Sequence, residues 1–211
     1  MSRRGRLIVD AARPAPAMLA EAARVLRAGE LVAFPTETFY GLGAHALDEL
    51  AVSRVFQAKG RPADKPLLVL VDSVSMVARV AGDVPARARR LMDRFWPGPL
   101  TLVLAAHPRL PVALTGGTGT IGVRLSSHPV ACALVTALGA PITAPSANRH
   151  GAPSPRTAGE VVESLGNRID LVLDGGATPG GPPSTLLDLT RTPAVVLRAG
   201  AVVPTRDDLE G

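Results

Sequence analysis

Both lysines of the chain stand within one short segment. The sequence holds 23 basic residues, and Lys59 and Lys65 are its only lysines. Arg61 lies between them, where a glycine and a proline end the preceding helical pattern. A compact ammonium group binds phosphate oxygens as a point charge, so these three cations favour a polyphosphate site. The alternative is a solvated loop whose cations only complement the dipole of the helix before it.

A second group of polar residues follows a short apolar strand. Residues 35–43 bring three hydroxyl side chains, one carboxylate and two glycines directly after that strand. Polar groups at the carboxyl end of a strand are typical of a ligand crevice in an α/β sheet. Thr36 and Thr38 are equally suited to satisfying backbone groups in an ordinary strand-to-turn connection. The pattern alone leaves both interpretations open.

An arginine with no acidic neighbour in sequence ends a third stretch, residues 118–124. An arginine at this place can hold a carboxylate through two parallel hydrogen bonds. Residues 144–148 also follow an apolar strand, and the helix that begins beyond them can hold an anion at its start. Ser184 and Arg198 flank two further strands and are, taken singly, more typical of turn and surface positions.

The elements that must position these groups alternate between helical and strand patterns. This alternation favours a mixed or parallel sheet within one α/β domain. Asp48 is predicted to cap the second helix, which should turn Leu50, Val52, Val55 and Phe56 toward the core. We predict helices over residues 15–28, 48–58, 73–80, 85–95, 129–138 and 157–165. We predict strands over residues 6–9, 31–35, 67–71, 100–105, 120–125, 141–144, 171–174, 185–189 and 195–198.

Length and composition indicate a single domain. A chain of 211 residues with 46% hydrophobic content can bury one substantial core. We divide it into an N-terminal segment that holds a short strand (1–15), one domain (16–203) and a polar tail (204–211). No apolar run approaches the roughly 20 residues that cross a bilayer, so we predict no membrane segment.

Net charge and cysteine content limit the kinds of partner and of metal site that the chain can have. The net charge of +5 indicates an anionic partner, either a nucleotide or a nucleic acid, although 3% aromatic content provides little base stacking. Cys132 is the only cysteine, which excludes an intramolecular disulfide and a four-cysteine zinc site. We expect Cys132 to be a buried packing residue and the protein to be cytoplasmic.

Taken together and in order, these stretches resemble the YrdC family of threonylcarbamoyl-AMP synthases. The matching segments are 35–43, 59–66, 96–101, 123–129, 141–148, 175–185 and 197–200. The resemblance implies an α/β fold, with a twisted mixed sheet flanked by helices and a large positively charged cavity, in a short single-domain form. It also implies the condensation of L-threonine, bicarbonate and ATP into L-threonylcarbamoyladenylate, with release of pyrophosphate.

The resemblance assigns roles to individual positions. Lys59 and Arg61 would be the catalytic cations that neutralise the triphosphate. Contacts with L-threonine would come from Thr38, Arg124, Ser146 and Ser184, and contacts with ATP from Arg61, Lys65, Thr120, Asn148, Arg156 and Arg198. The sequence departs from the family pattern at two positions, since Leu70 stands where many members have histidine and Arg156 where many have threonine. The metal ligands are not readable.

The resemblance also implies partners. Mg²⁺ would arrive with ATP, and downstream proteins would transfer the threonylcarbamoyl group to the adenosine beside the anticodon of tRNA. Direct contact with tRNA is left open. An RNA-binding protein of the same fold without synthase activity is the alternative, which the basic charge favours. A third interpretation is a carbamoyl-adenylate-forming module like those within hydrogenase maturation proteins, and the free-standing chain disfavours it.

Overall fold

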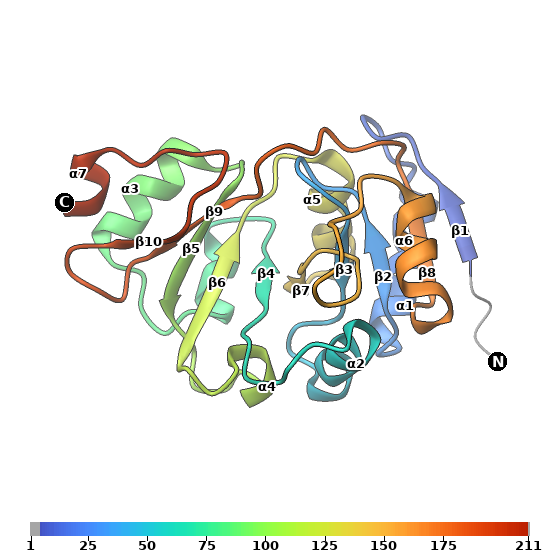
Figure 1. Cartoon of the computed structure of the whole chain (residues 1–211), viewed down its shortest axis with the longest axis horizontal. Helices are drawn as coiled ribbons and strands as arrows, with labels where there is room; N and C mark the ends of the chain where they lie inside the picture. Colours follow the sequence, from blue (N-terminus) through green and yellow to red (C-terminus); the bar gives the residue numbers. More distant parts are fainter. Residues whose placement is uncertain (1–4, 211) are drawn as a thin grey trace.

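Two sheets, each with parallel and antiparallel strand pairs, form the framework of the chain (Figure 1). The structure is a computed structural model that describes residues 5–210, so residues 1–4 of the predicted N-terminal segment lie outside it. The four-stranded sheet has the order β1 (Gly5–Ile8), β8 (Leu171–Asp174), β2 (Val32–Phe34), β3 (Gly41–Gly43). The six-stranded sheet has the order β10 (Val195–Arg198), β9 (Thr185–Asp188), β5 (Leu100–Ala105), β6 (Thr120–Arg124), β4 (Leu68–Leu70), β7 (Ile142–Thr143).

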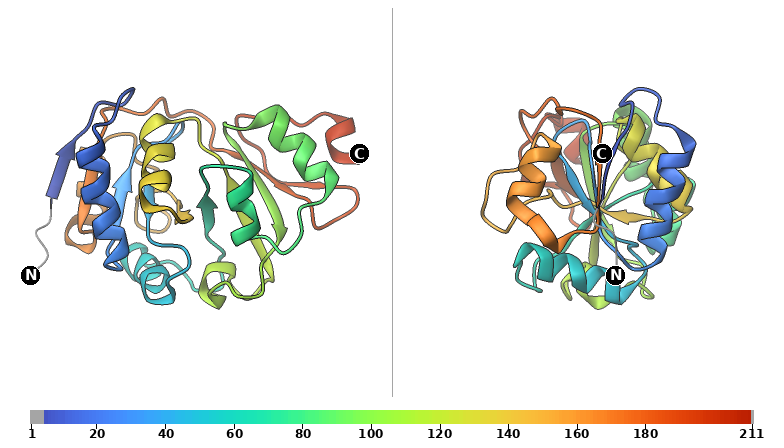
Figure 2. Two further views of the ribbon diagram at one scale, coloured as in Figure 1. Left: turned by 180° about the vertical axis from the view of Figure 1, so that it is seen from behind. Right: turned by 90° about the vertical axis from the view of Figure 1, so that its right-hand side faces the viewer.

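Helices surround both sheets. They are α1 (Pro16–Arg27), α2 (Glu49–Lys59), α3 (Ala86–Phe95), α4 (Val112–Thr115), α5 (Pro129–Leu138), α6 (Ala158–Leu165) and α7 (Arg206–Glu210), with 3₁₀ turns at Ser75–Arg79 and Gly166–Arg168. Helix α1 packs against β2 and β8 on one face of the four-stranded sheet, with α5 beside it, and α6 covers the opposite face (Figure 2). No helix within residues 5–210 is both long enough and apolar enough to cross a membrane.

The two sheets meet at strands β3 and β7. The amide of Leu42 donates to Pro145 O at 2.8 Å, and the amide of Thr143 donates to Ala44 O at 3.0 Å. Gly43 makes the close approach feasible, because a Cβ there would lie 2.8 Å from a methyl group of Ile142. The loops at this junction therefore carry side chains from both sheets into one region.

The predicted α/β fold with a mixed sheet and flanking helices is confirmed, although the strands divide between two sheets. The predicted cap is confirmed too, because the Asp48 carboxylate accepts from the amides of Leu50 and Ala51. The prediction that Leu50 faces the core is wrong, since Leu50 is 78% exposed. Leu50 and Val52 are two residues apart in a helix and project in nearly opposite directions, so they cannot both be buried.

Other differences concern short elements. The predicted helix over 73–80 is a 3₁₀ turn, and β3 and α4 were not predicted. Within the predicted polar tail, α7 docks on α3, where Arg94 pairs with Asp208 at 2.7 Å. Cys132 is half-buried rather than fully buried. Short elements of this kind are fixed by contacts with distant segments, which local patterns do not record.

Candidate functional site

A cavity of about 440 Å³ opens where the two sheets meet. Its walls come from the loop between β2 and β3, from strands β6, β9 and β10, and from the loops that follow α2 and β7. Eight of the predicted site residues line it: Thr38, Arg61, Lys65, Thr120, Arg124, Ser146, Ser184 and Arg198. The structure therefore brings most of the predicted site residues together around one cavity.

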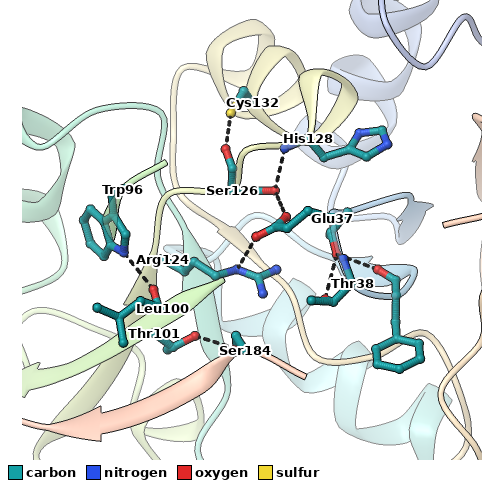
Figure 3. Close-up of polar contacts among 12 residues, drawn as sticks. Glu37, Thr38, Trp96, Leu100, Thr101, Arg124, Ser126, His128, Cys132 and Ser184 are labelled. Atoms are coloured by element: carbon teal, nitrogen blue, oxygen red, sulfur yellow. Dashed lines mark hydrogen bonds and ion pairs between the residues drawn. The ribbon is translucent and has the colours of Figure 1, made fainter. Parts of the chain in front are cut away.

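Arg124 is the most deeply buried cation of the lining, with 4% of its side chain exposed. It stands at the end of β6, and Glu37 from the β2–β3 loop is its acidic partner (Figure 3). Glu37 Oε1 lies 3.8 Å from Arg124 Nε, and Ser126 Oγ donates to Glu37 Oε2. Burial lowers the pKa of Arg124, and the charge of Glu37 opposes that change. A guanidinium nonetheless keeps its charge in proteins.

The β2–β3 loop takes its shape from its own hydroxyl groups. Thr36 Oγ1 donates to Phe39 O at 2.7 Å and accepts from the Thr38 amide at 3.2 Å. The two threonine hydroxyls lie 3.2 Å apart, and both residues line the cavity. The Thr36 hydroxyl therefore satisfies local backbone groups, as one interpretation of the pattern predicted, and both residues also line the cavity, so a role in binding stays a prediction.

Ser184 and Arg198 also line the cavity and are hydrogen-bonded to each other. Arg198 donates to Ser184 O at 2.8 Å and to Ser184 Oγ at 3.0 Å, and Ser184 Oγ lies 2.9 Å from Thr101 Oγ1. Arg198 is exposed as a whole, but desolvation of its guanidinium, and to a lesser extent the charge of Arg124, lowers its pKa. Two guanidinium groups thus face one cavity, where an anionic ligand would relieve their mutual repulsion.

The segment 59–65, here termed the lysine loop, presents Arg61 and Lys65 to the cavity. Arg61 donates to Pro66 O at 3.0 Å, and Lys65 Nζ lies 3.4 Å from His150 Nε2. Gly116 packs closely against this loop. A Cβ there would lie 2.7 Å from Asp64 O, and its φ of 58° also favours glycine. Within residues 5–210, no carboxylate forms an ion pair with this loop.

Lys59 and Asn148 are not among the side chains that line the cavity. Lys59 is 3% exposed, and its Nζ donates to Ser146 O and, at 2.6 Å, to Asn148 O. Burial lowers the pKa of Lys59 to about 8. The Asn148 amide donates to Ala152 O at 2.6 Å. In this arrangement both side chains stabilise the loop that carries Ser146, and their predicted contacts with phosphate stay predictions.

Arg156 and Leu70 also lie away from the cavity lining. Arg156 is exposed on the surface, where its Nε donates to Thr178 O at 3.3 Å. Leu70 is fully buried within β4, paired in register with Arg124 on one side and Ile142 on the other. The structure therefore does not bring Arg156 together with the other predicted ATP contacts.

Sequence reasoning missed Glu37, the acidic partner of Arg124, and Ser126, which donates to Glu37. Glu37 lay inside a stretch that was singled out, yet no role was given to it, and Ser126 was not considered. The signal available was the carboxylate beside Thr38 at a strand end, which is where site residues gather in such sheets. Nothing local links Glu37 to Arg124, because they meet only when β6 approaches the β2–β3 loop.

Known proteins resemble this chain over most of its length. A family model for Sua5, YciO and YrdC proteins, described as telomere recombination, matches residues 24–200. The chain is 50% identical over 181 residues to the threonylcarbamoyl-AMP synthase of Pyrococcus abyssi, covering 86% of this chain and 53% of that relative. Against the Bacillus subtilis protein of the same name it is 45% identical over 193 residues, covering 91% and 55%. The chain thus spans about half the length of these two relatives.

Solved structures agree with this relationship. The structure of Pyrococcus abyssi Sua5 complexed with L-threonine has a TM-score of 0.89 at 47% identity, covering 92% of this chain and 57% of that chain. Escherichia coli YciO has a TM-score of 0.84 at 28% identity, covering 99% of this chain and 100% of that chain. From its sequence and its fold together, the chain belongs to the Sua5/YciO/YrdC family.

Proposed function

We propose that the chain synthesises L-threonylcarbamoyl-AMP from L-threonine, bicarbonate and ATP and releases pyrophosphate. The observation that carries the proposal is one cavity with a buried guanidinium, Arg124, on one side and the cations of the lysine loop on the other. Such a cavity suits a small carboxylate ligand beside a polyphosphate. The relatives named threonylcarbamoyl-AMP synthase, and the relative whose structure contains L-threonine, give the proposal independent support.

In this proposal the threonine carboxylate binds the terminal nitrogens of Arg124. The hydroxyl groups of Thr38, Ser146 and Ser184 line the same cavity and would orient the amine and the hydroxyl of threonine. Arg61, Lys65 and Arg198 would hold the triphosphate of ATP. Holding both substrates in one small cavity brings the reacting groups together without a covalent enzyme intermediate.

Two bond-forming steps follow. The threonine amine attacks the carbon of bicarbonate, water leaves, and a carbamate forms. A carbamate oxygen then attacks the α-phosphorus of ATP, and the bond to the bridging oxygen of pyrophosphate breaks. The described part of the cavity lining contains no aspartate, glutamate or histidine, so its contribution is to position substrates and to stabilise charge. Arg61 and Lys65 would neutralise the departing pyrophosphate.

Magnesium enters the proposal as part of the ATP substrate. Among residues 5–210, no group of three His, Cys, Asp or Glu side chains is placed to hold a metal ion. Mg²⁺ characteristically keeps several water ligands and binds substrate phosphates, which suits a cavity that supplies cations and hydroxyl groups. The ion would therefore be held by the phosphate oxygens and by water.

The product is an activated intermediate that other proteins would consume. We propose that downstream transfer proteins pass the threonylcarbamoyl group to the adenosine beside the anticodon of tRNA, in the cytoplasm. The chain's own reaction requires no contact with tRNA. A strongly salt-dependent affinity for tRNA, in a folded chain that does not bind L-threonine, would favour the RNA-binding alternative instead.

The decisive experiment measures pyrophosphate release with each substrate omitted in turn. Release should require ATP, L-threonine and bicarbonate together, and mass spectrometry should detect the threonylcarbamoyl adenylate. Arg61→Ala should slow release by at least about tenfold, because one charge-assisted contact with phosphate is lost. Arg109→Ala, which removes an exposed arginine outside the cavity lining, is the matched control. Release that continues without threonine would contradict the proposal.

A further inference from the structure

The contact between Arg124 and Glu37 leaves two buried atoms without hydrogen-bond partners. Within the described part of the chain, Arg124 Nε and Glu37 Oε1 are both shielded from solvent and neither has a partner. They face each other at 3.8 Å, which is close enough for strong attraction between charges but too long for a hydrogen bond. The Nε edge of the guanidinium is therefore turned toward Glu37.

Glu37 is held in place from its other side. Ser126 Oγ donates to Glu37 Oε2, and Ser126 Oγ in turn accepts from the His128 amide at 3.2 Å. The Cys132 thiol donates to Ser126 O at 2.7 Å, which ties the loop after β6 to helix α5 (Figure 3). The carboxylate is thus fixed by groups other than Arg124, so it can serve as a fixed reference for the guanidinium.

The remaining edge of the guanidinium faces the cavity. In Figure 3 the terminal nitrogens of Arg124 point into the space between Thr38 and Ser184. All three residues line the cavity, whereas Glu37 does not. A ligand would therefore meet the two terminal nitrogens and would not meet the carboxylate directly.

Glu37 also distinguishes Arg124 from the other cations of the cavity. Arg61, Lys65 and Arg198 form no ion pair with a carboxylate within residues 5–210. A phosphate group that carries two negative charges would be attracted to those three cations and repelled by Glu37 at Arg124. An amino acid brings one carboxylate with its own ammonium group, and repulsion from Glu37 is correspondingly small.

We propose that Glu37 is a positioning and specificity-determining residue that acts through Arg124. It holds the Nε edge of the guanidinium so that the terminal nitrogens form a fork for an α-carboxylate, and its charge keeps phosphate groups out of that fork. The inference deepens the proposed function, on which it rests, by assigning the two substrates to different cations of one cavity.

The test compares binding in the absence of turnover. Isothermal titration of the full chain with L-threonine, and separately with inorganic pyrophosphate, should be carried out for the wild type, Glu37→Gln and Glu37→Asp. Glu37→Gln keeps an oxygen that accepts from Ser126, removes the charge, and places an NH2 group where the other oxygen faced Arg124. We expect it to weaken L-threonine binding by at least about tenfold and to make pyrophosphate compete with threonine. Glu49→Gln, an exposed change in the first turn of α2, is the matched control.

The outcomes separate the two proposals. Glu37→Asp keeps the charge, so pyrophosphate should still fail to compete with threonine in that variant, and this readout would not respond to a loss of packing alone. One outcome would overturn the role of Glu37 and leave the synthase proposal standing. In that outcome the wild type binds threonine, the Kd of Glu37→Gln for threonine lies within twofold of the wild-type value, and pyrophosphate still does not compete with threonine in this variant. If the wild type binds no threonine, both proposals are overturned.

Discussion

The two sides of the cavity hold their cations in different ways. On one side Arg124 is buried at the end of a strand, with a carboxylate beside it and a hydroxyl fixing that carboxylate. On the other side, Arg61 and Lys65 stand on a loop, where Arg61 donates to a backbone carbonyl at 3.0 Å and no carboxylate forms an ion pair with either within residues 5–210. The first arrangement is fixed by two sheets, and the second by turns within the loop and by its contacts with Gly116 and His150.

This difference indicates how one cavity can bind two different anions at separate places. A guanidinium between rigid strands presents a fixed fork, which suits one planar carboxylate. Cations on a loop that form no ion pair with a carboxylate within residues 5–210 keep their charge for a ligand and can adapt to a flexible polyphosphate. The predictions below test this separation, in order of decreasing effect on binding.

The largest effect is expected for Arg124→Lys. A lysine keeps the charge but loses the fork, so the Kd for L-threonine should rise by about 50-fold, because two parallel hydrogen bonds become one. The Kd for a non-hydrolysable ATP analogue should change by less than about threefold, since the lysine loop is untouched. Calorimetry with each ligand alone measures both constants. An equal loss for the two ligands would show that the sides do not act separately.

The next largest effect is expected at Gly200, which packs against the backbone on both sides of Ser184. A Cβ on Gly200 would lie 2.2 Å from Pro183 O and 2.5 Å from the Thr185 amide, so Gly200→Ala must displace that wall. We expect a loss of about 2 kcal/mol in the free energy of unfolding and roughly tenfold weaker threonine binding. Urea unfolding and calorimetry check the two effects. Gly159→Ala is the control, because its Cβ would meet nothing closer than 3.8 Å.

A pH effect should arise from Lys59, which supports the loop that carries Asn148, a predicted contact for ATP. Its pKa of about 8 means that the ammonium loses its proton above pH 8 and donates more weakly to Ser146 O and Asn148 O. Affinity for the ATP analogue should fall about threefold between pH 7 and pH 9.5 in the wild type, and this change should be absent in Lys59→Met.

Stability should change in the opposite direction over the same range. Because the pKa of Lys59 is lower in the folded chain than its ordinary value of 10.5, the folded state binds fewer protons between pH 8 and pH 10.5. The contribution of this group to the free energy of unfolding is therefore lowest below pH 8 and rises toward pH 10.5. The lowered pKa of Lys59 would be contradicted if the affinity for the ATP analogue and the contribution of Lys59 to the free energy of unfolding both fall as pH rises.

The smallest effect is expected for Arg156→Ala. Arg156 is exposed and lies outside the cavity lining, so the Kd for the ATP analogue should stay within about twofold of the wild-type value. A change of tenfold or more would mean that the bound state draws Arg156 toward the nucleotide, as the family pattern led us to predict.

Much of the fold could be predicted because its longer elements have strong local patterns. The helix over 129–138 was predicted with the bounds that the structure gives to α5, since Pro129 favours its start and Gly139 its end. The division into two sheets could not be predicted, because it depends on pairings such as Gly5 with Leu171. No local pattern records which distant strands will be neighbours.

The site was predicted by residue type more reliably than by orientation. Arg124 and Ser184 follow or precede strands, and strand ends converge on the cavity. Lys59 stands at the end of α2, where one residue of rotation decides whether a side chain faces the cavity or the protein interior. Its ammonium turns inward, because two backbone carbonyls satisfy it there.

The thiol of Cys132 can be used to follow movement of the loop after β6. Burial raises the pKa of Cys132 to about 11, and the thiol donates to Ser126 O at 2.7 Å. Since the thiolate is the form that reacts quickly with alkylating reagents, the raised pKa and this hydrogen bond should slow modification of the half-buried thiol at neutral pH. Because the sequence has no other cysteine, the rate of alkylation would report on the contact between Cys132 and the loop after β6, and a bound ligand that holds this loop should slow it.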